Sequence, residues 1–156
     1  MIKGMDNLFK KLSALNTDAK AILEKTVTRN MKETVQAEAK LLCPVDISDL
    51  HDSIKVKTER EGSNIRGIVY TNSDHAAYVE FGTGKTGEDT PVADKYPGDL
   101  SYKQDKWLVN IPDVGLRYIA GQAAQPYLYP ALKNNEEKII ENIKTDLKKA
   151  IKGAAK

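Results

Sequence analysis

Residues 75–84, with the sequence HAAYVEFGTG, constrain the fold more than any other stretch of this chain. Small apolar and aromatic side chains crowd around a single carboxylate, and the stretch ends on two closely spaced glycines. Glycine adopts positive φ without the steric penalty that other residues meet, so this pattern indicates a packed element ending where the backbone turns. We therefore expect a site or an interface here, with the candidate residues Tyr78, Glu80, Phe81, Gly82, Thr83 and Gly84.

Helical periodicity precedes this stretch. From Asp6, a predicted N-cap, apolar residues recur at helical spacing as far as Leu42, and Pro44 ends the pattern. We predict helix over residues 6–43. A single rod and a short helix followed by a long one both fit the sequence, because Asn16-Thr17-Asp18 contains good capping residues.

A second helix is predicted at the other end of the chain. Pro126 and Pro130 favour extended or first-turn geometry, and an apolar stripe with helical spacing follows them. These features predict a helix over residues 130–152, with the preceding aromatic segment reaching the core beside Val79 and Phe81. The candidate motif residues of this segment are Pro126, Tyr127, Leu128 and Pro130.

Between the helices, the apolar period changes to two. The segment 54–59 alternates apolar and charged residues, turn residues follow, and 65–71 is a second β-prone run, which together predict an antiparallel hairpin. We expect a further strand near 106–111 in the same sheet, with both helices packed on one face of it. Residues 85–105 are polar and rich in Gly and Pro, so they predict a long inserted loop that becomes ordered against a partner.

The connection between the first helix and the hairpin is predicted to be a structured corner. In the segment 44–54, Asp46 and Ser48 are suited to cap one helical turn, and Leu50 and Ile54 are spaced to face inward. With 156 residues and 40% hydrophobic content, the chain is long enough for one ordinary core.

These elements predict an α+β fold in which a small antiparallel sheet packs against a long N-terminal helix and a C-terminal helix. We expect one domain over residues 1–156, made of a helical part (6–43), a sheet and loop part (54–125) and a C-terminal helix (130–152).

Catalytic chemistry finds little support in the sequence. His51 and His75 have no metal-ligand spacing, and the GTGKTG run at 82–87 lacks the spacing of a phosphate-binding loop. The carboxylates Asp46, Asp49 and Asp52 fit a capped, solvated turn, and Cys43 fits a small buried hydrophobe. Backbone hydrogen bonding or pairing with a base is the favoured role for Glu80. We therefore expect no enzyme activity, no metal and no cofactor.

The chain also lacks a membrane-spanning run and a signal peptide, so we expect it to be made in a cytoplasm without contacting a membrane. Its termini are basic and its middle is acidic, while the net charge is only +2. Lysines alternate with acidic residues along the last helix, which favours a solvated helix face over a concentrated nucleic-acid interface. A nucleic-acid-binding protein that contacts DNA through its basic helices remains the alternative interpretation.

Three motifs, in this order and spacing, resemble a protein family. They are the corner Pro44-Val45-Asp46 with Leu50 and Ser53-Ile54, the stretch 77–84, and the segment 125–132 (QPYLYPAL). Together they resemble the head-tail joining or tail-completion proteins of the neck of tailed bacteriophages and prophages. At the corner, family members commonly have Thr-Gly where this chain has Ile47-Ser48, and an arginine where it has His51.

The resemblance implies a structural virion protein without catalytic residues. Its subunits would form a homo-oligomeric ring, for example a hexamer, between the phage connector and the tail-tube proteins, or at the tail end. Packaged DNA would pass through the channel of the ring. The implied location is the virion neck or tail end, reached by assembly in the host cytoplasm.

Overall fold

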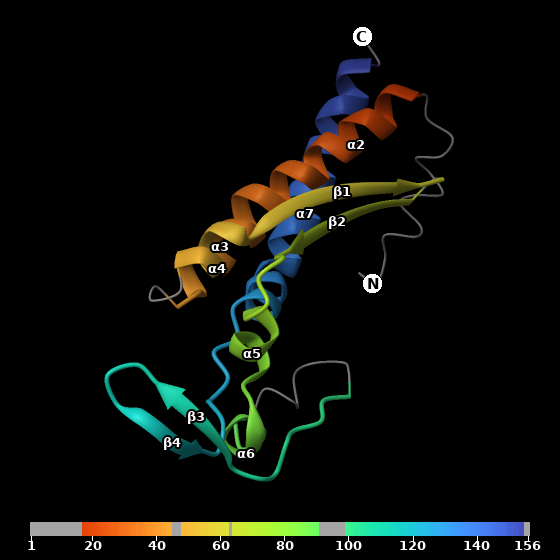
Figure 1. Ribbon diagram of the computed structural model, residues 1–156. Coiled ribbons are helices and arrows are strands. Elements are labelled where there is room, and N and C mark those ends of the chain that lie inside the picture. The colour runs from red at the N-terminus through yellow and green to blue at the C-terminus, as the bar shows by residue number, and fades with distance from the viewer. Residues whose placement is uncertain (1–16, 45–47, 63, 91–98, 155–156) are drawn as a thin grey trace.

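The computed structural model describes residues 17–44, 48–62, 64–90 and 99–154 (Figure 1). The predicted helical residues 6–16 and the middle of the predicted loop, residues 91–98, lie outside this part. The described chain forms an elongated α+β structure with a helical body at one end and a small hairpin at the other. The predicted fold class is confirmed.

The N-terminal helix consists of α2 (Thr17–Asn30), the π-helical segment η1 (Met31–Gln36) and α3 (Ala37–Leu42). The backbone at Asn30 and Gln36 is right-handed helical, so the three segments form one continuous rod. The rod ends at Cys43, whose extended backbone (ψ 133°) is the geometry that proline imposes on the residue before it. The predicted helix stop at Pro44 is confirmed.

Helix α7 (Leu128–Ala154) packs antiparallel on this rod. Polar contacts set the alignment: Arg29 binds Asp146, and Asn142 donates to Asn30 Oδ1 (2.7 Å). Asn134 donates to Glu38 Oε1 (2.8 Å), and Asn135 donates to Glu38 Oε2. Helix α7 is slightly longer than the predicted helix at 130–152, because the segment before Pro130 already has helical geometry.

The β1–β2 hairpin lies across the N-terminal rod (Figure 1). Strand β1 (Lys55–Glu61) pairs antiparallel with β2 (Asn64–Tyr70), as predicted. Gly67 allows the close approach, since a Cβ atom there would lie 2.5 Å from Met31 Cγ and 2.8 Å from Val27 Cγ1. Helix α4 (Ser48–Ser53) forms the predicted corner before the hairpin, and both Leu50 and Ile54 are buried.

One hydrophobic core joins these elements. It combines the inner faces of the N-terminal rod and α7 with the corner and with Val79 of helix α5 (Ala76–Phe81). Its buried members are Leu23, Val27, Met31, Val35, Ala39, Cys43, Leu50, Ile54, Val79, Tyr127, Ala131, Ile139, Ile143 and Leu147.

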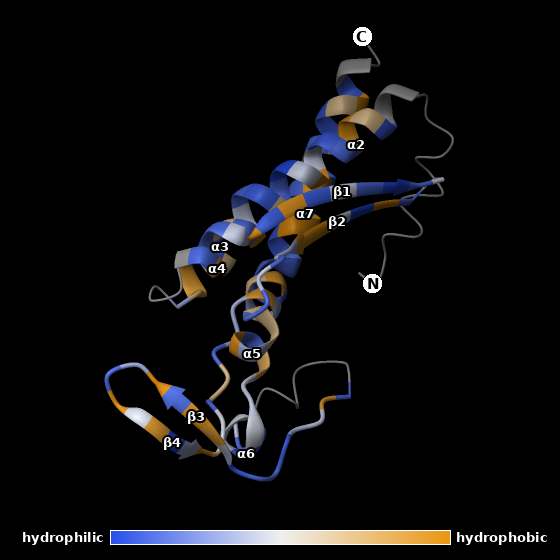
Figure 2. Cartoon of the chain, viewed as in Figure 1, coloured by the Kyte–Doolittle hydropathy of each residue, from blue (hydrophilic) through white to orange (hydrophobic). Residues whose placement is uncertain are grey.

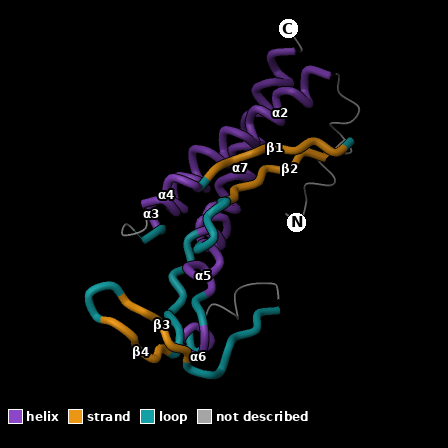
Figure 3. The backbone as a smooth tube through the Cα atoms, in the orientation of Figure 1, coloured by secondary structure: helices purple, strands orange, loops and turns teal. Residues whose placement is uncertain are grey.

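A second, separate hairpin corrects the predicted sheet. Strand β3 (Trp107–Ile111), which the sequence predicts, pairs with β4 (Gly115–Ile119), which it does not, and neither strand joins β1–β2. Helices α5 (Ala76–Phe81) and α6 (Gly84–Glu88) connect the helical body to this hairpin (Figure 3). The expectation of one three-stranded sheet is therefore wrong, because the apolar residues at 107–111 find a local partner in the segment that follows them directly.

The expected loop 85–105 also differs from the structure in its first residues, which continue α6. Figure 2 shows that apolar residues line the inner side of the helical body and also lie on both strands of the distant hairpin. The two hairpins thus have different environments: β1–β2 covers the core, whereas β3–β4 lies away from it.

The core predicts a clear contrast between two leucines. Leu50 is 0% exposed, while Leu41 on α3 is 85% exposed. We expect Leu50→Ala to lower the free energy of unfolding by about 2–5 kcal/mol, because it removes buried methyl groups and leaves a cavity. The matched control Leu41→Ala should change it by less than about 0.5 kcal/mol. Urea unfolding measures both, and similar losses for the two variants would contradict this core.

Candidate functional site

The carboxylate of Glu80 caps the N-terminus of α7. Its Oε2 accepts hydrogen bonds from the backbone N–H groups of Tyr127 (2.8 Å) and Leu128 (2.9 Å), and its Oε1 accepts one from Tyr129 (2.9 Å). Pro130 follows and has no N–H to satisfy. The N–H groups of residues 127–129 therefore have an acceptor and residue 130 has no N–H, although the first turn of a helix offers its amides no internal partners.

Burial makes this cap strong. Glu80 is 4% exposed and its negative charge lies at the positive end of the α7 dipole. Of the two roles that the sequence favours for Glu80, backbone hydrogen bonding and pairing with a base, the structure shows the first. The stretch 75–84 and the segment 125–132 thus form one site, because Glu80 comes from the former and its three donors come from the latter.

Backbone contacts extend this junction beyond Glu80. Gln125 N–H donates to the carbonyl of Val79 (2.8 Å), and the Gln122 side chain donates to the carbonyl of Tyr78 (2.8 Å). Thr83 and Gln122 form an isolated antiparallel bridge, in which the two N···O distances are 2.9 and 3.1 Å. The segment 120–125 therefore runs back along the end of α5.

Glycines make this close approach possible. Gly82, Gly84 and Gly121 have φ of +73°, +59° and +109°, which favours glycine on conformational grounds alone. Space adds a second requirement: a Cβ on Gly82 would lie 2.8 Å from Ala124 N, and one on Gly121 would lie 1.7 Å from the carbonyl oxygen of Thr83. We call these three glycines the glycine junction.

Tyr127 fills the space beneath the cap. It is 0% exposed, and its hydroxyl has no hydrogen-bond partner among the described residues. Burial raises the pKa of Tyr127 far above its usual range, and the nearby Glu80 charge raises it further. Burial also raises the pKa of the Cys43 thiol, so this cysteine is a buried apolar side chain in the core, as predicted.

An apolar groove opens beside the cap. Its volume is about 410 Å³, and it lies between the N-terminal rod, β2, α5 and α7. The walls include Met31, Val35, Val69, Ala76, Phe81 and Leu132. Glu80 also borders the groove, but its oxygens are engaged with the α7 amides. The sequence predicts Phe81 in the core beside Val79; Phe81 is instead partly buried and forms a wall of this groove.

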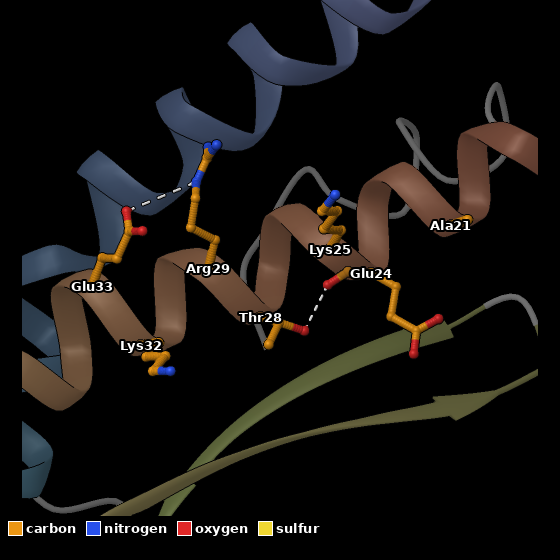
Figure 4. A pocket seen from close by; sticks show the side chains of 7 residues that line it. All are labelled: Ala21, Glu24, Lys25, Thr28, Arg29, Lys32 and Glu33. Carbon is orange, nitrogen blue, oxygen red and sulfur yellow. Dashed lines mark hydrogen bonds and ion pairs between the residues drawn. The ribbon is translucent and has the colours of Figure 1, made fainter.

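A second hollow lies on the solvent side of α2 (Figure 4). Lys25, Arg29 and Lys32 alternate there with Glu24 and Glu33, and Arg29 Nε lies 3.9 Å from Glu33 Oε2. The figure shows these side chains projecting from a single helix, with Arg29 and Glu33 directed toward α7 and Glu24 toward the strands. This is a face of mixed charge, and the residues that line it form no cluster of one sign that would select an anion or a cation.

The structure places the predicted candidates in two groups. Glu80, Gly82, Thr83, Gly84, Tyr127 and Leu128 meet at the cap and the glycine junction, and Pro130 lies in the first turn of α7. Pro126 directly precedes the amides that Glu80 binds. Tyr78, in contrast, is 55% exposed and contributes its carbonyl oxygen to the junction. Sequence reasoning missed Gly121 and Gln122, since neither lies in a periodic segment or a recognisable motif.

The described residues contain no group of three or more His, Cys, Asp or Glu side chains placed to hold a metal ion. In this same part of the chain, no helix combines the length and the apolar character that crossing a bilayer requires.

Comparison with known proteins gives one match. Residues 6–82, just under half of the chain, match the family model HK97-gp10_like, described as "Bacteriophage HK97-gp10, putative tail-component". The match includes the corner and the stretch 75–84 as far as Gly82, and it stops before the segment 125–132. It confirms the resemblance to a tailed-phage head-tail or tail-completion family, and a phage tail component is part of the virion. No curated protein and no solved structure gives a significant match.

The cap predicts that Glu80 stabilises the whole fold. We expect Glu80→Ala to lower the free energy of unfolding by at least about 2 kcal/mol, because it leaves buried amides unpaired at a helix terminus. Glu80→Gln keeps one acceptor oxygen, so its loss should be smaller. Glu137→Ala on the exposed face of α7 is the control, with a change within about 0.5 kcal/mol. Wild-type melting of both Glu80 variants would refute this role.

The glycine junction predicts a difference between two glycines that share positive φ. A Cβ atom on Gly62 (φ +60°) would have nothing within 4 Å, so Gly62→Ala should show backbone strain alone, about 1–3 kcal/mol. Gly82→Ala adds steric overlap with backbone atoms that cannot move aside. We expect a clearly larger loss in thermal melts, and equal losses would show that the segment 120–125 does not pack tightly on Gly82.

Proposed function

We propose that this chain is a structural protein of the phage neck or tail end. In this proposal, its copies form an oligomeric ring, such as a hexamer, that joins the head connector to the tail tube or completes the tail, with the packaged DNA passing through the ring. The proposal assigns the chain no catalytic chemistry. Assembly takes place in the host cytoplasm and the product is part of the virion.

One observation supports this proposal beyond the family match. The β3–β4 hairpin lies away from the helical body (Figure 1). It exposes large apolar side chains, and the Thr83–Gln122 bridge anchors its base. Exposed apolar groups that gather on one element mark surfaces that other proteins cover. A subunit that must contact neighbours of its own kind and two different partners needs such a surface outside its core.

A nucleic-acid-binding role is the second candidate, and one feature favours it. Lys144, Lys148, Lys149 and Lys152 are exposed along the last turns of α7, where the carboxylate of Asp146 is occupied by Arg29. The helix terminus gives these lysines a simpler role, since cations there offset the α7 dipole. Retention on DNA that weakens steeply with salt would support the second candidate, whereas wild-type retention by a variant with all four changed to Gln would oppose it.

The test of the proposed function is a nonsense mutation in the gene for this chain, made in the phage that encodes it. We expect lysates to contain DNA-filled heads and separate tails, or tails with incomplete ends, when viewed by electron microscopy. Adding the purified protein should restore joined particles, and antibody labelling should mark the neck or the tail end. Infectious particles that form without the protein, or purified virions that lack it, would refute the proposal.

A further inference from the structure

The β3–β4 hairpin has an uncovered apolar face. Its register places Leu108 opposite Tyr118 and Asn110 opposite Leu116, so these four side chains share one side of the ribbon. Leu108, Leu116 and Tyr118 are 49%, 59% and 72% exposed. A two-stranded hairpin by itself is marginally stable in water, and it gains stability when another surface covers it.

The apolar groove beside the cap offers a surface of matching character. Its walls are aliphatic and aromatic, and its 410 Å³ has room for a few large side chains. Leu132 lies at its edge and is 47% exposed. Among the described residues that line it, Glu80 is the one carboxylate, and its oxygens accept hydrogen bonds from the amides at the start of α7, so it presents no unpaired charge to an apolar side chain entering the groove.

The hairpin does not fill the groove of its own chain. The Thr83–Gln122 bridge and the glycine junction fix its base at the far end of α5 from β2, as Figure 3 shows. An apolar projection and an apolar recess therefore occur at different places on one chain. Such a pair generates head-to-tail contacts between identical copies, which close into rings when the rotation allows it.

The size of the buried interface favours docking of the hairpin beside the groove of a second copy over contact between two hairpin faces. A standard interface buries about 800 Å² on each partner. Contact between two hairpin faces would use only one face of a ribbon whose strands are about 17 Å long, which is small for a stable pair. Insertion beside the groove brings the helical body of the neighbour into contact with the exposed face of the hairpin, while Trp107 and Val109 on the other side are already partly buried in their own chain.

We propose that the β3–β4 hairpin of one copy docks into the groove between α5, β2 and α7 of the next copy. This inference rests on the proposed function, because it specifies how neighbours in the ring contact each other. The interface is head-to-tail, with Leu108, Leu116 and Tyr118 on one side and Phe81 and Leu132 on the other.

Two variants of the full chain test it by size-exclusion chromatography with light scattering at high micromolar concentration. The hairpin variant carries Leu108→Ser, Leu116→Ser and Tyr118→Ser, and the groove variant carries Leu132→Glu. All four positions are exposed, so both variants should keep the wild-type circular dichroism, which shows that they fold. We expect each variant alone to be monomeric, and the control Leu41→Ser, also exposed but part of neither surface, to assemble like the wild type.

Mixing separates this contact from other arrangements. The groove variant keeps an intact hairpin and the hairpin variant keeps an intact groove, so an equimolar mixture should give one-to-one dimers and nothing larger. Assembly of the groove variant alone would overturn the proposal in favour of hairpin pairing. If the wild type and both variants each assemble on their own, only this docking mode is overturned. A wild type that stays monomeric argues against the ring as well.

Crosslinking gives a second readout that does not depend on disrupting the contact. Tyr118→Cys and Leu132→Cys are introduced into separate chains in which Cys43 is replaced by Ala. Under mild oxidation, we expect disulfide dimers only when the two chains are mixed. Dimers of the Tyr118→Cys chain with itself, or no dimers in the mixture of assembling chains, would refute the head-to-tail contact.

Discussion

The carboxylate of Glu80 at the N-terminus of α7 is the interaction on which the rest of the structure depends. It joins residues that are 47 to 49 positions apart in sequence, and it does so with two oxygens and three amides in a buried setting. A surface ion pair across the same separation would contribute little, because water and salt would screen it. Here the amides lie in a first helical turn, which offers them no internal acceptor, so the cap fixes where the longest helix starts and how α5 meets it.

Much of this organisation is encoded locally and can be predicted. Helical spacing before Pro44, the alternation at 54–59 and the prolines around Tyr127 are each sufficient to assign the nearby backbone. The meeting of the stretch 75–84 with the segment 125–132 is also predictable, because both are apolar motifs that end or begin an element. The role of Glu80 follows from its apolar neighbours, which leave a carboxylate few partners other than the backbone.

The rest depends on contacts between distant segments. Gly115, Leu116, Arg117 and Tyr118 of β4 are all exposed, so the strand has no buried face that would impose an alternating pattern on its sequence. Periodicity therefore cannot reveal it. The partner of Thr83 is equally hidden, because Gln122 pairs with it through backbone atoms that any residue would supply. A prediction from the size of its side chain places Phe81 in the core. In the structure, its position at the end of α5 directs it toward the groove.

At the glycine junction, Gly121 lies against Thr83 and Gly84, although the intervening chain extends through α6 and the second hairpin. The chain therefore leaves the helical body and returns to it at almost the same place. The described residues between these two points, 83–90 and 99–120, contribute no side chain to the hydrophobic core, so the core imposes no constraint on their sequence. Such an arrangement makes this part of the chain an interchangeable module: its length or sequence can change while the body that carries it keeps its fold.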